Sequence, residues 1–330
     1  MPTPQSHPEF PLWELDYEPE ELWDTFWPKG FQFVQKMVNR WYDGRVILIG
    51  DAAHVFPPFG AQGIANGLRD AMALSWRLAL LCRPDSTRTT QPQSDALLNA
   101  WARERCQGVD KATRLTAANG FFLQNKSKTL TTAVWFVSGI LDYLPRVRST
   151  ILQNHFSDAA GFIGVDNGFF LGAQGGGGKA AQVFAKGANR SIQLSDGFFW
   201  TGAALTLLLL HQPSLDEYSD IVRVIKRAKL SFCLLADRVI ILGRDSSSVD
   251  FPGDTPGLDW AVLTPATAEE LGAAGVETRP LYDPGAFRKR FHAQTKYALM
   301  RSDFIIFSQA QTLEAVEAQL AWAEEMVAGV

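Results

Sequence analysis

The stretch GDAAHVFPPFGAQGIANG, residues 50–67, decides the fold of this chain. It follows a short apolar run, RVILI at residues 45–49, and leads into a helical pattern that begins at Ile64. A strand, a glycine loop and a helix in this order are typical of α/β proteins that aim backbone N–H groups and a helix amino terminus at a ligand. The continuous apolar run predicts a strand that is buried on both faces and is not an isolated edge.

The loop after this strand has the residues that a flat, hydroxyl-bearing ligand requires. Asp51 lies just past the strand, where a carboxylate accepts a hydrogen bond from a sugar-type hydroxyl. Pro57 and Pro58 stiffen the turn, and Gly60 and Gly63 let a planar ligand approach the main chain. The pattern indicates a nucleotide-like cofactor. Spacing alone leaves open a purely structural loop, because Gly and Pro are ordinary turn residues.

Length and composition restrict the classes of protein. The chain has 330 residues, enough for about two domains. With 31 basic and 35 acidic residues its net charge is -4, so no general field attracts nucleic acid or an anionic membrane, and a small-molecule partner is expected. The three cysteines, Cys82, Cys106 and Cys233, are far apart, which argues against a disulfide framework and a zinc site. With no secretory signal in MPTPQSHPEF, we expect a reducing, cytoplasmic location.

Helical patterns surround the opening stretch. Residues 31–43 place Phe33, Met37, Val38 and Trp41 on one helical face. Further helices are expected from residue 64 to before Pro84, over 95–122 and over 130–153. The apolar run at 130–141, LTTAVWFVSGIL, is shorter than the ~18 residues of a membrane span, and it predicts a buried helix. The first of these helices places five apolar residues at helical spacing: Leu68, Ala71, Leu74, Leu78 and Leu81.

The second half of the chain has a different organisation. Residues 161–184 are rich in glycine and irregular, and within them residues 172–180 predict a flexible connection, because they do not match the spacing of a phosphate-binding loop. Short apolar runs then alternate with helical patterns up to a closing helix at 312–326, which is typical of a small α/β domain. We therefore expect two domains, residues 1–160 and 161–330.

The opening stretch and its flanks resemble the second flavin-binding motif of the FAD-dependent aromatic hydroxylases, the class A flavoprotein monooxygenases related to phenol hydroxylase and p-hydroxybenzoate hydroxylase. The carboxyl-terminal half is similar to the thioredoxin-like domain of the phenol hydroxylase relatives, with Arg301-Ser302-Asp303 where the family has Arg-Pro-Asp before a strand. The positions in register are Gly44-Arg45-Val46, Gly50-Asp51-Ala52-Ala53-His54, Pro57-Pro58, Gly60-x-Gln62-Gly63, Gly67, Asp70-Ala71, Leu74-x-Trp76-Arg77-Leu78 and Trp101-x-x-Glu104-Arg105.

This resemblance implies an α/β fold: part of a Rossmann-like FAD-binding domain of the p-hydroxybenzoate hydroxylase type, followed by a thioredoxin-like α/β domain. Asp51 would bind the ribityl chain of FAD, Pro58 would lie near the reactive edge of the isoalloxazine, and main chain from Gly60 to Ile64 would contact the ring. Ala61 stands where many members have Gly, and Ala65 where many have Asn. The expected cofactor-binding residues are Asp51, Pro58, Gly60, Ala61, Gln62, Gly63 and Ile64, with no metal ligand and no catalytic side chain assigned.

The implied activity is hydroxylation of an aromatic or phenolic substrate, or of a natural-product intermediate, with NAD(P)H and O2. His54 is expected to have a packing or hydrogen-bonding role, and the thioredoxin-like domain, without a cysteine pair, is expected to be redox-silent. The sequence has no GxGxxG after a strand, the segment by which the family binds the FAD pyrophosphate. Two alternatives therefore stay open: a truncated, non-catalytic fragment, and a subunit completed by a second chain or a homodimer.

Overall fold

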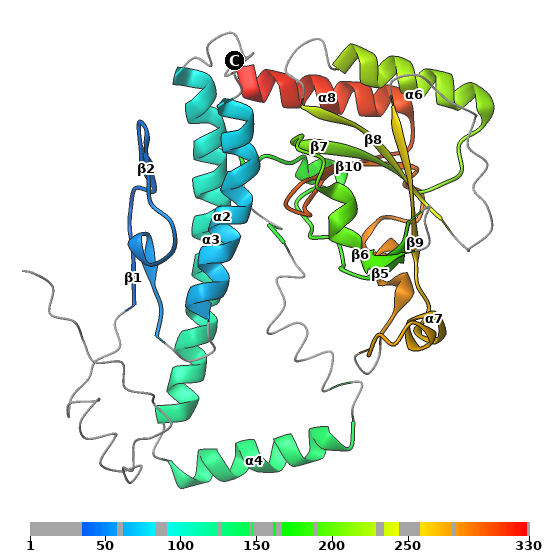
Figure 1. Ribbon diagram of the computed structural model, residues 1–330. Helices are drawn as coiled ribbons and strands as arrows, with labels where there is room; N and C mark the ends of the chain where they lie inside the picture. Colours follow the sequence, from blue (N-terminus) through cyan, green and yellow to red (C-terminus); the bar gives the residue numbers. More distant parts are fainter. Residues whose placement is uncertain are drawn as a thin grey trace, which may run out of the picture.

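The computed structural model describes residues 35–57, 62–82, 91–124, 127–144, 147, 161–162, 167–187, 191–228, 234–243, 258–278 and 282–328. Short strands and long helices form the amino-terminal part, and a larger sheet forms the carboxyl-terminal part (Figure 1). The mixed α/β class expected from the sequence is confirmed. The two-domain division at residue 160 stays a prediction.

The amino-terminal part begins with two small antiparallel sheets. Strand β1 (Lys36–Met37) pairs with β4 (His54–Val55), and β2 (Tyr42–Asp43) pairs with β3 (Val46–Ile47). The 3-10 turn η2 (Gly50–Ala52) lies between β3 and β4. The helix expected over residues 31–43 is therefore wrong from residue 35 onward, because the backbone there pairs with other strands instead of with itself.

The prediction that the 45–49 run is buried on both faces is also wrong. Strand β3 spans two residues and pairs only with β2 among the described strands. The side chain of Val46 is 65% exposed, and Ile49 is also exposed. An apolar run identifies a strand, but burial on both faces requires layers of structure above and below it.

Two long helices follow, α2 (Gln62–Leu81) and α3 (Gln91–Gln124), and they pack against each other. Both helices were expected, but the inward face of α2 differs from the predicted one, since Leu68 and Ala71 are exposed. Three polar residues at the helical spacing i, i+4 and i+11, Asn66, Asp70 and Arg77, lie on the buried face. The buried residues of α2 are Asn66, Asp70, Ala73, Leu74, Trp76 and Arg77.

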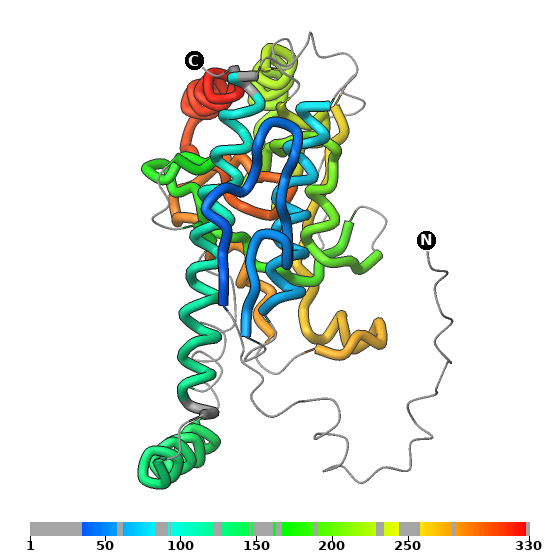
Figure 2. The backbone as a smooth tube through the Cα atoms, turned by 90° about the vertical axis from the view of Figure 1, so that its left-hand side faces the viewer, coloured from blue at the N-terminus to red at the C-terminus, as the bar shows by residue number. Residues whose placement is uncertain are grey.

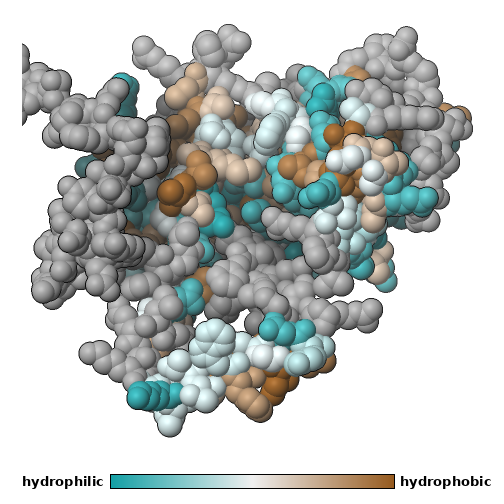
Figure 3. Space-filling view, turned by 60° about the horizontal axis from the view of Figure 1, so that its bottom comes forward, coloured by the Kyte–Doolittle hydropathy of each residue, from teal (hydrophilic) through white to brown (hydrophobic). Residues whose placement is uncertain are grey.

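Helix α4 (Lys128–Asp142) forms as expected but is not buried. It lies apart from the sheet at the far end of α3 (Figures 1 and 2). Ser127 caps its amino terminus, and its Oγ accepts a hydrogen bond from Leu130 N at 3.4 Å. Trp135 is 74% exposed, and hydrophobic side chains lie on the surface of the helix (Figure 3). The helical pattern was correct, and the burial was not, because no described element packs on this helix.

The carboxyl-terminal part is a seven-stranded mixed sheet in the order β11-β10-β7-β8-β9-β5-β6. Strands β7, β8 and β9 are parallel neighbours, and the other pairs are antiparallel. The closing helix and the α/β alternation agree with the sequence. The elements are β5 (Phe184–Lys186), β6 (Ile192–Leu194), β7 (Leu205–Leu209), α6 (Leu215–Ala228), β8 (Leu235–Leu242), β9 (Asp259–Pro265), α7 (Ala268–Ala273), β10 (Tyr297–Arg301), β11 (Ile306–Ala310) and α8 (Leu313–Ala328).

Apolar layers cover both faces of this sheet. Leu205, Leu207 and Leu209 of β7 join a core with α6 and α8, while Leu208 joins a second core that contains Phe199 and Phe287. This alternation explains why β7 is apolar at four of its five positions, all but Thr206, as expected for a strand covered on both sides. Trp76, Leu97 and Ala100 from α2 and α3 belong to the first core, so the two parts of the chain share buried surface.

The glycine-rich segment is not a flexible connection where the structure describes it. Gly177 N donates to Ile306 O at 2.8 Å, and Ile306 N donates to Gly178 O at 2.8 Å, so the segment pairs with the edge of β11. A Cβ on Gly176 would lie 2.1 Å from the carbonyl oxygen of Phe307. Glycine is needed there because two backbones approach closely, which composition alone does not distinguish from flexibility.

Candidate flavin-binding site

The predicted site lies where the chain leaves β3 and enters α2. Asp51 is in η2 and is exposed, and Gln62, Gly63 and Ile64 form the first turn of α2. Ile64 is 82% exposed. The remaining predicted residues, Pro58, Gly60 and Ala61, lie outside the described residues.

Backbone contact holds η2 against α2. Gly50 has a φ of +56°, and a Cβ on Gly67 would lie 3.4 Å from the Cα of Gly50. Glycine at both positions allows the turn to adopt a left-handed conformation and to lie directly on the helix. Asp51, the carboxylate of the predicted site, therefore lies on a turn whose position is fixed by main-chain contact with α2.

Asp70 of α2 fastens the same turn with its side chain. Its Oδ2 accepts hydrogen bonds from Gly50 N at 2.9 Å and His54 Nε2 at 2.7 Å. Its Oδ1 accepts from Arg105 Nε at 2.6 Å, and Arg105 also donates to Asn66 Oδ1 at 3.0 Å. These five residues join the turn, α2 and α3 in one buried network.

The electrostatics of this network favour an ionised Asp70. Burial alone would raise the pKa of the carboxyl group, but the hydrogen bond from His54, the charge of Arg105 and the Gly50 N–H together hold the pKa below its ordinary value of 3.8. An ionised carboxylate only accepts hydrogen bonds, so Nε2 of His54 carries the proton that the two groups share.

His54 has the packing and hydrogen-bonding role expected of it. Its ring lies 5.6 Å from that of Trp41 and 5.1 Å from that of Phe56, and it is buried. A buried imidazole enclosed by aromatic rings and bound to Asp70 has no access to a substrate.

The sequence interpretation quoted Asp70, Arg105 and Glu104 as motif residues without assigning them a role. One signal for a buried role was present in the sequence. The charged Asp70 lies four residues before the apolar Leu74 and therefore on the same side of the helix. Charged residues are almost never fully buried unless paired. A partner for Asp70 was therefore implied, but its identity depends on how α2 and α3 pack.

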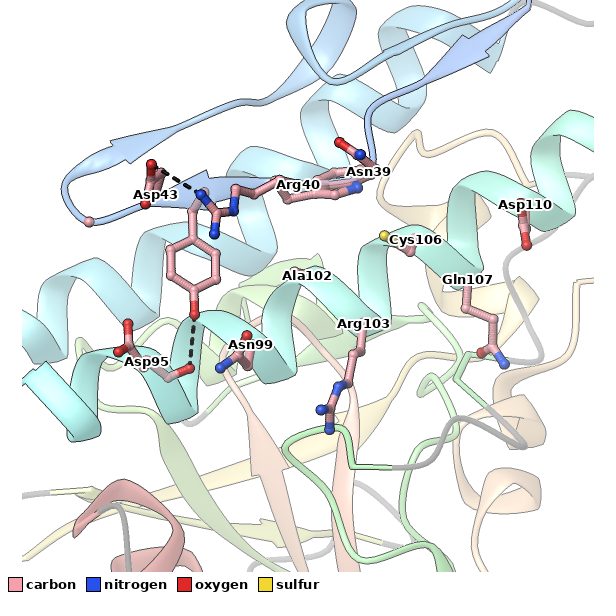
Figure 4. A pocket seen from close by; sticks show the side chains of 13 residues that line it. Asn39, Arg40, Asp43, Asp95, Asn99, Ala102, Arg103, Cys106, Gln107 and Asp110 are labelled. Atoms are coloured by element: carbon pink, nitrogen blue, oxygen red, sulfur yellow. Dashed lines mark hydrogen bonds and ion pairs between the residues drawn. The ribbon is translucent and has the colours of Figure 1, made fainter.

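A groove of about 870 Å3 lies beside this network, between residues 39–44 and α3 (Figure 4). Tyr42 donates from its hydroxyl to Asp95 O at 3.4 Å, and Arg40 pairs with Asp43 at 3.2 Å. Of the predicted flavin-binding residues that the structure describes, Asp51, Gln62, Gly63 and Ile64, none lines this groove. It belongs to the junction between the strand segment and α3.

The described part of the site fits a flavin in two respects. The first turn of α2, residues 62–65, has no acidic side chain, so no carboxylate of that turn competes with an electron-rich ring edge for the positive end of the helix. Asp51 offers a carboxylate for polyol hydroxyls. The exposed Ile64, Leu68 and Ile49 provide apolar surface nearby.

Two further properties of the described residues concern metal binding and membranes. No group of three or more His, Cys, Asp or Glu side chains in those residues is arranged to hold a metal ion. Among the helices the structure describes, none is both long and apolar enough to cross a membrane.

Over part of its length the chain is similar to known FAD-binding proteins and hydroxylases. Residues 15–116 match the family model described as an FAD binding domain. The 3-(3-hydroxy-phenyl)propionate/3-hydroxycinnamic acid hydroxylases of Escherichia coli O139:H28 and of Escherichia coli K12 are each 32% identical to this chain over 129 residues. That match covers 39% of this chain and 22% of each hydroxylase. The chain thus spans well under two thirds of these relatives.

Among solved structures, OxyS anhydrotetracycline hydroxylase from Streptomyces rimosus superposes with a TM-score of 0.50 and 18% sequence identity. The match covers 88% of this chain and 46% of that chain. At this identity the likeness concerns the fold, and it extends over both the amino-terminal helices and the carboxyl-terminal sheet.

Proposed function

We propose, from the premise that this chain belongs to the class A flavoprotein monooxygenase family, that it binds FAD at the turn between β3 and α2. The observation that carries the proposal is the placement of Asp51 on a turn fastened to α2 beside an amino-terminal helical turn without acidic residues. FAD, when bound, supplies the redox chemistry for oxygen activation.

In this proposal each group of the chain has one task. Asp51 accepts hydrogen bonds from the ribityl hydroxyls, and the backbone of Gln62, Gly63 and Ile64 faces the ring. The positive end of α2 stabilises negative charge on the flavin by about 0.3–1 kcal/mol. Pro58, Gly60 and Ala61, outside the described residues, complete the predicted set.

The overall reaction proposed is hydroxylation of an aromatic or phenolic substrate with NAD(P)H and O2 in the cytoplasm. It is supported by the similarity to hydroxylases whose names state 3-(3-hydroxy-phenyl)propionate and 3-hydroxycinnamic acid. No side chain of this chain is assigned to the chemical step. The substrate-contacting groups are proposed to lie on polypeptide that covers the flavin.

A specific observation favours this completion by further polypeptide. Val46 in β3, and Ile64 and Leu68 in the first turns of α2, are each more than 60% exposed. Exposed apolar residues gathered around a site mark a surface that another segment covers. The covering polypeptide would be a second chain or a second copy of this chain. Either one would shield the flavin from water.

The test is FAD titration of the purified full chain, followed by absorbance and fluorescence. We expect Asp51→Ala to weaken FAD binding about 10- to 100-fold, the loss expected for one charge-assisted hydrogen bond. Asp216→Ala, which removes an exposed carboxylate on α6, is the matched control and should leave the affinity unchanged. A wild-type chain that binds no FAD would support the non-catalytic reading and end this proposal.

A further inference from the structure

Four charged side chains are buried together where α2 and α3 meet the carboxyl-terminal sheet. Arg77 comes from α2, Glu104 from α3, and Arg301 and Asp303 from the end of β10 and the turn after it. Arg77, Glu104 and Arg301 are fully buried, and Asp303 is 7% exposed. Two positive and two negative charges compensate one another, as burial of ionised groups requires.

Glu104 is the centre of this cluster. Its two oxygens accept from Arg301 Nη1 and Nη2 at 2.8 and 2.9 Å, in a bidentate pair. Arg77 Nη2 donates to the same carboxylate at 2.9 Å, and Phe169 N donates at 2.8 Å. Burial alone would raise the pKa of Glu104, but Arg301 and Arg77 lower it to about 2. The carboxylate therefore stays ionised and holds α3 to the sheet.

The turn after β10 completes the junction. Arg301 Nε donates to Asp303 Oδ1 at 2.9 Å, and Trp76 Nε1 donates to Asp303 Oδ2 at 3.2 Å. The guanidinium carbon of Arg77 lies 4.2 Å from the centre of the Trp76 ring. The motifs that the sequence placed far apart, Trp76-Arg77, Glu104-Arg105 and Arg301-Ser302-Asp303, thus meet in one contact.

The next residue of α3 faces the predicted flavin site. Glu104 binds the carboxyl-terminal sheet, while its neighbour Arg105 binds Asp70, which holds Gly50 N. Because the two residues are adjacent on one helix, a displacement of α3 moves both. A buried series of charged contacts therefore runs from Arg301 to the turn that carries Asp51.

We infer that Arg301 is a positioning residue for the flavin site: through Glu104 and α3, the carboxyl-terminal sheet sets the placement of Asp70 and of the Gly50–Ala52 turn. This inference rests on the proposed function for its consequence in FAD binding. The structural part of the inference is that the position of the Gly50–Ala52 turn depends on Arg301. This part can be tested without FAD.

The first measurement is hydrogen exchange on the full chain without added cofactor. We expect Arg301→Met to speed exchange in residues 50–55 more than in β8, which lies in the same sheet but outside the cluster. Arg238→Met is the matched control, since Arg238 pairs with Asp259 at an exposed site at 2.6 Å. Equal acceleration at both segments would mean general destabilisation, and no change at 50–55 would mean no coupling. Either result overturns the inference.

The second measurement is FAD affinity, with the flavin absorbance spectrum as a report on the ring environment. We expect Arg301→Met to raise the Kd for FAD about 2- to 30-fold, the range for residues that act through others. Arg301→Met and Asp70→Asn should be non-additive in Kd, because they lie on one series of contacts. Additive effects would contradict the inference. If the wild type binds no FAD, the proposed function fails, while hydrogen exchange still decides the inference.

A milder variant keeps the test decisive if Arg301→Met does not fold. Trp76→Phe retains the aromatic packing and removes only the donor to Asp303. We expect a smaller acceleration of exchange in residues 50–55, and an unchanged rate there overturns the inference.

Discussion

Strands β7 and β3 are both apolar runs in the sequence, yet they differ in what surrounds them. All five residues of β7 are buried, between two apolar layers of the carboxyl-terminal sheet. In β3, Val46 is mostly exposed, and the strand has one partner among the described residues. In the described residues, the region of the predicted flavin site has the strand, turn and helix of an α/β core, but β3 lacks the apolar layers that cover β7.

The two regions are also stabilised by different interactions. The carboxyl-terminal sheet depends on apolar side chains packed on both faces. The flavin-site region depends in addition on buried charges, with Asp70 and Glu104 as the two acceptors that join α2, α3 and the sheet. Substitutions should therefore separate the regions by the kind of interaction that each one loses.

The largest effect is expected for Glu104→Gln. The change leaves two buried guanidinium groups, of Arg77 and Arg301, short of a compensating charge. We expect the free energy of unfolding to fall by about 3–5 kcal/mol, measured by urea denaturation. Glu277→Gln, at an exposed position, should change it by less than about 0.5 kcal/mol. A loss for Glu104→Gln no larger than that of this control would mean that the charged junction is not needed for stability.

The next effect compares the two strands directly. Leu207→Ala in β7 should lower the free energy of unfolding by about 2–5 kcal/mol, because it leaves a cavity in a packed core. Val46→Ala in β3 should change it by less than about 0.5 kcal/mol, because the side chain is already exposed. Equal losses in urea denaturation would show that β3 is covered in solution, for instance by a second copy of the chain.

The smallest of the three effects concerns Asp70 and depends on pH. Asp70→Asn removes the charge that accepts from Arg105, and we expect a loss of about 1.5–3 kcal/mol at pH 7. Since the folded-state pKa of Asp70 is depressed, its contribution is present above the ordinary value of 3.8 and is lost as pH falls through the folded-state pKa.

Unfolding of wild type and Asp70→Asn from pH 7 down to pH 3 checks this sign. The difference between the two proteins should be constant near neutral pH and should shrink only below the ordinary carboxyl pKa. A difference that grows on acidification would mean that Asp70 is protonated in the folded chain.

Some of the fold was predictable because it depends on neighbours along the chain. The helical spacing from Ile64 onward indicated α2, and β7, β8, β9 and α8 follow from local apolar patterns. Strand β10 was not predicted, and neither was the pairing of Gly177 with Ile306. Both depend on contacts with residues far away in the sequence.

The candidate site divides in the same way. The motif placed Asp51 after a strand and the residues up to Ile64 at the entry to a helix. In the structure Asp51 lies in η2, after β3, and Gln62–Ile64 form the first turn of α2, while their role in binding a flavin stays a prediction. The buried partner of Asp70 was not evident, because Arg105 lies 35 residues away on another helix. The exposure of α4 contradicts its apolar composition, since composition does not specify whether a partner is present.

The sequence by itself indicated the α/β class, the resemblance to a flavoprotein family and the residues proposed to bind a flavin, because each of these depends on short motifs with fixed spacing. Only the tertiary structure decided which charges pair, that Trp76-Arg77, Glu104-Arg105 and Arg301-Ser302-Asp303 form one junction, and which apolar faces are left uncovered. The physical reason is that burial and ion pairing are properties of packed elements. The environment of a side chain depends on packing between segments that are distant in the sequence, and a local sequence pattern does not specify that packing.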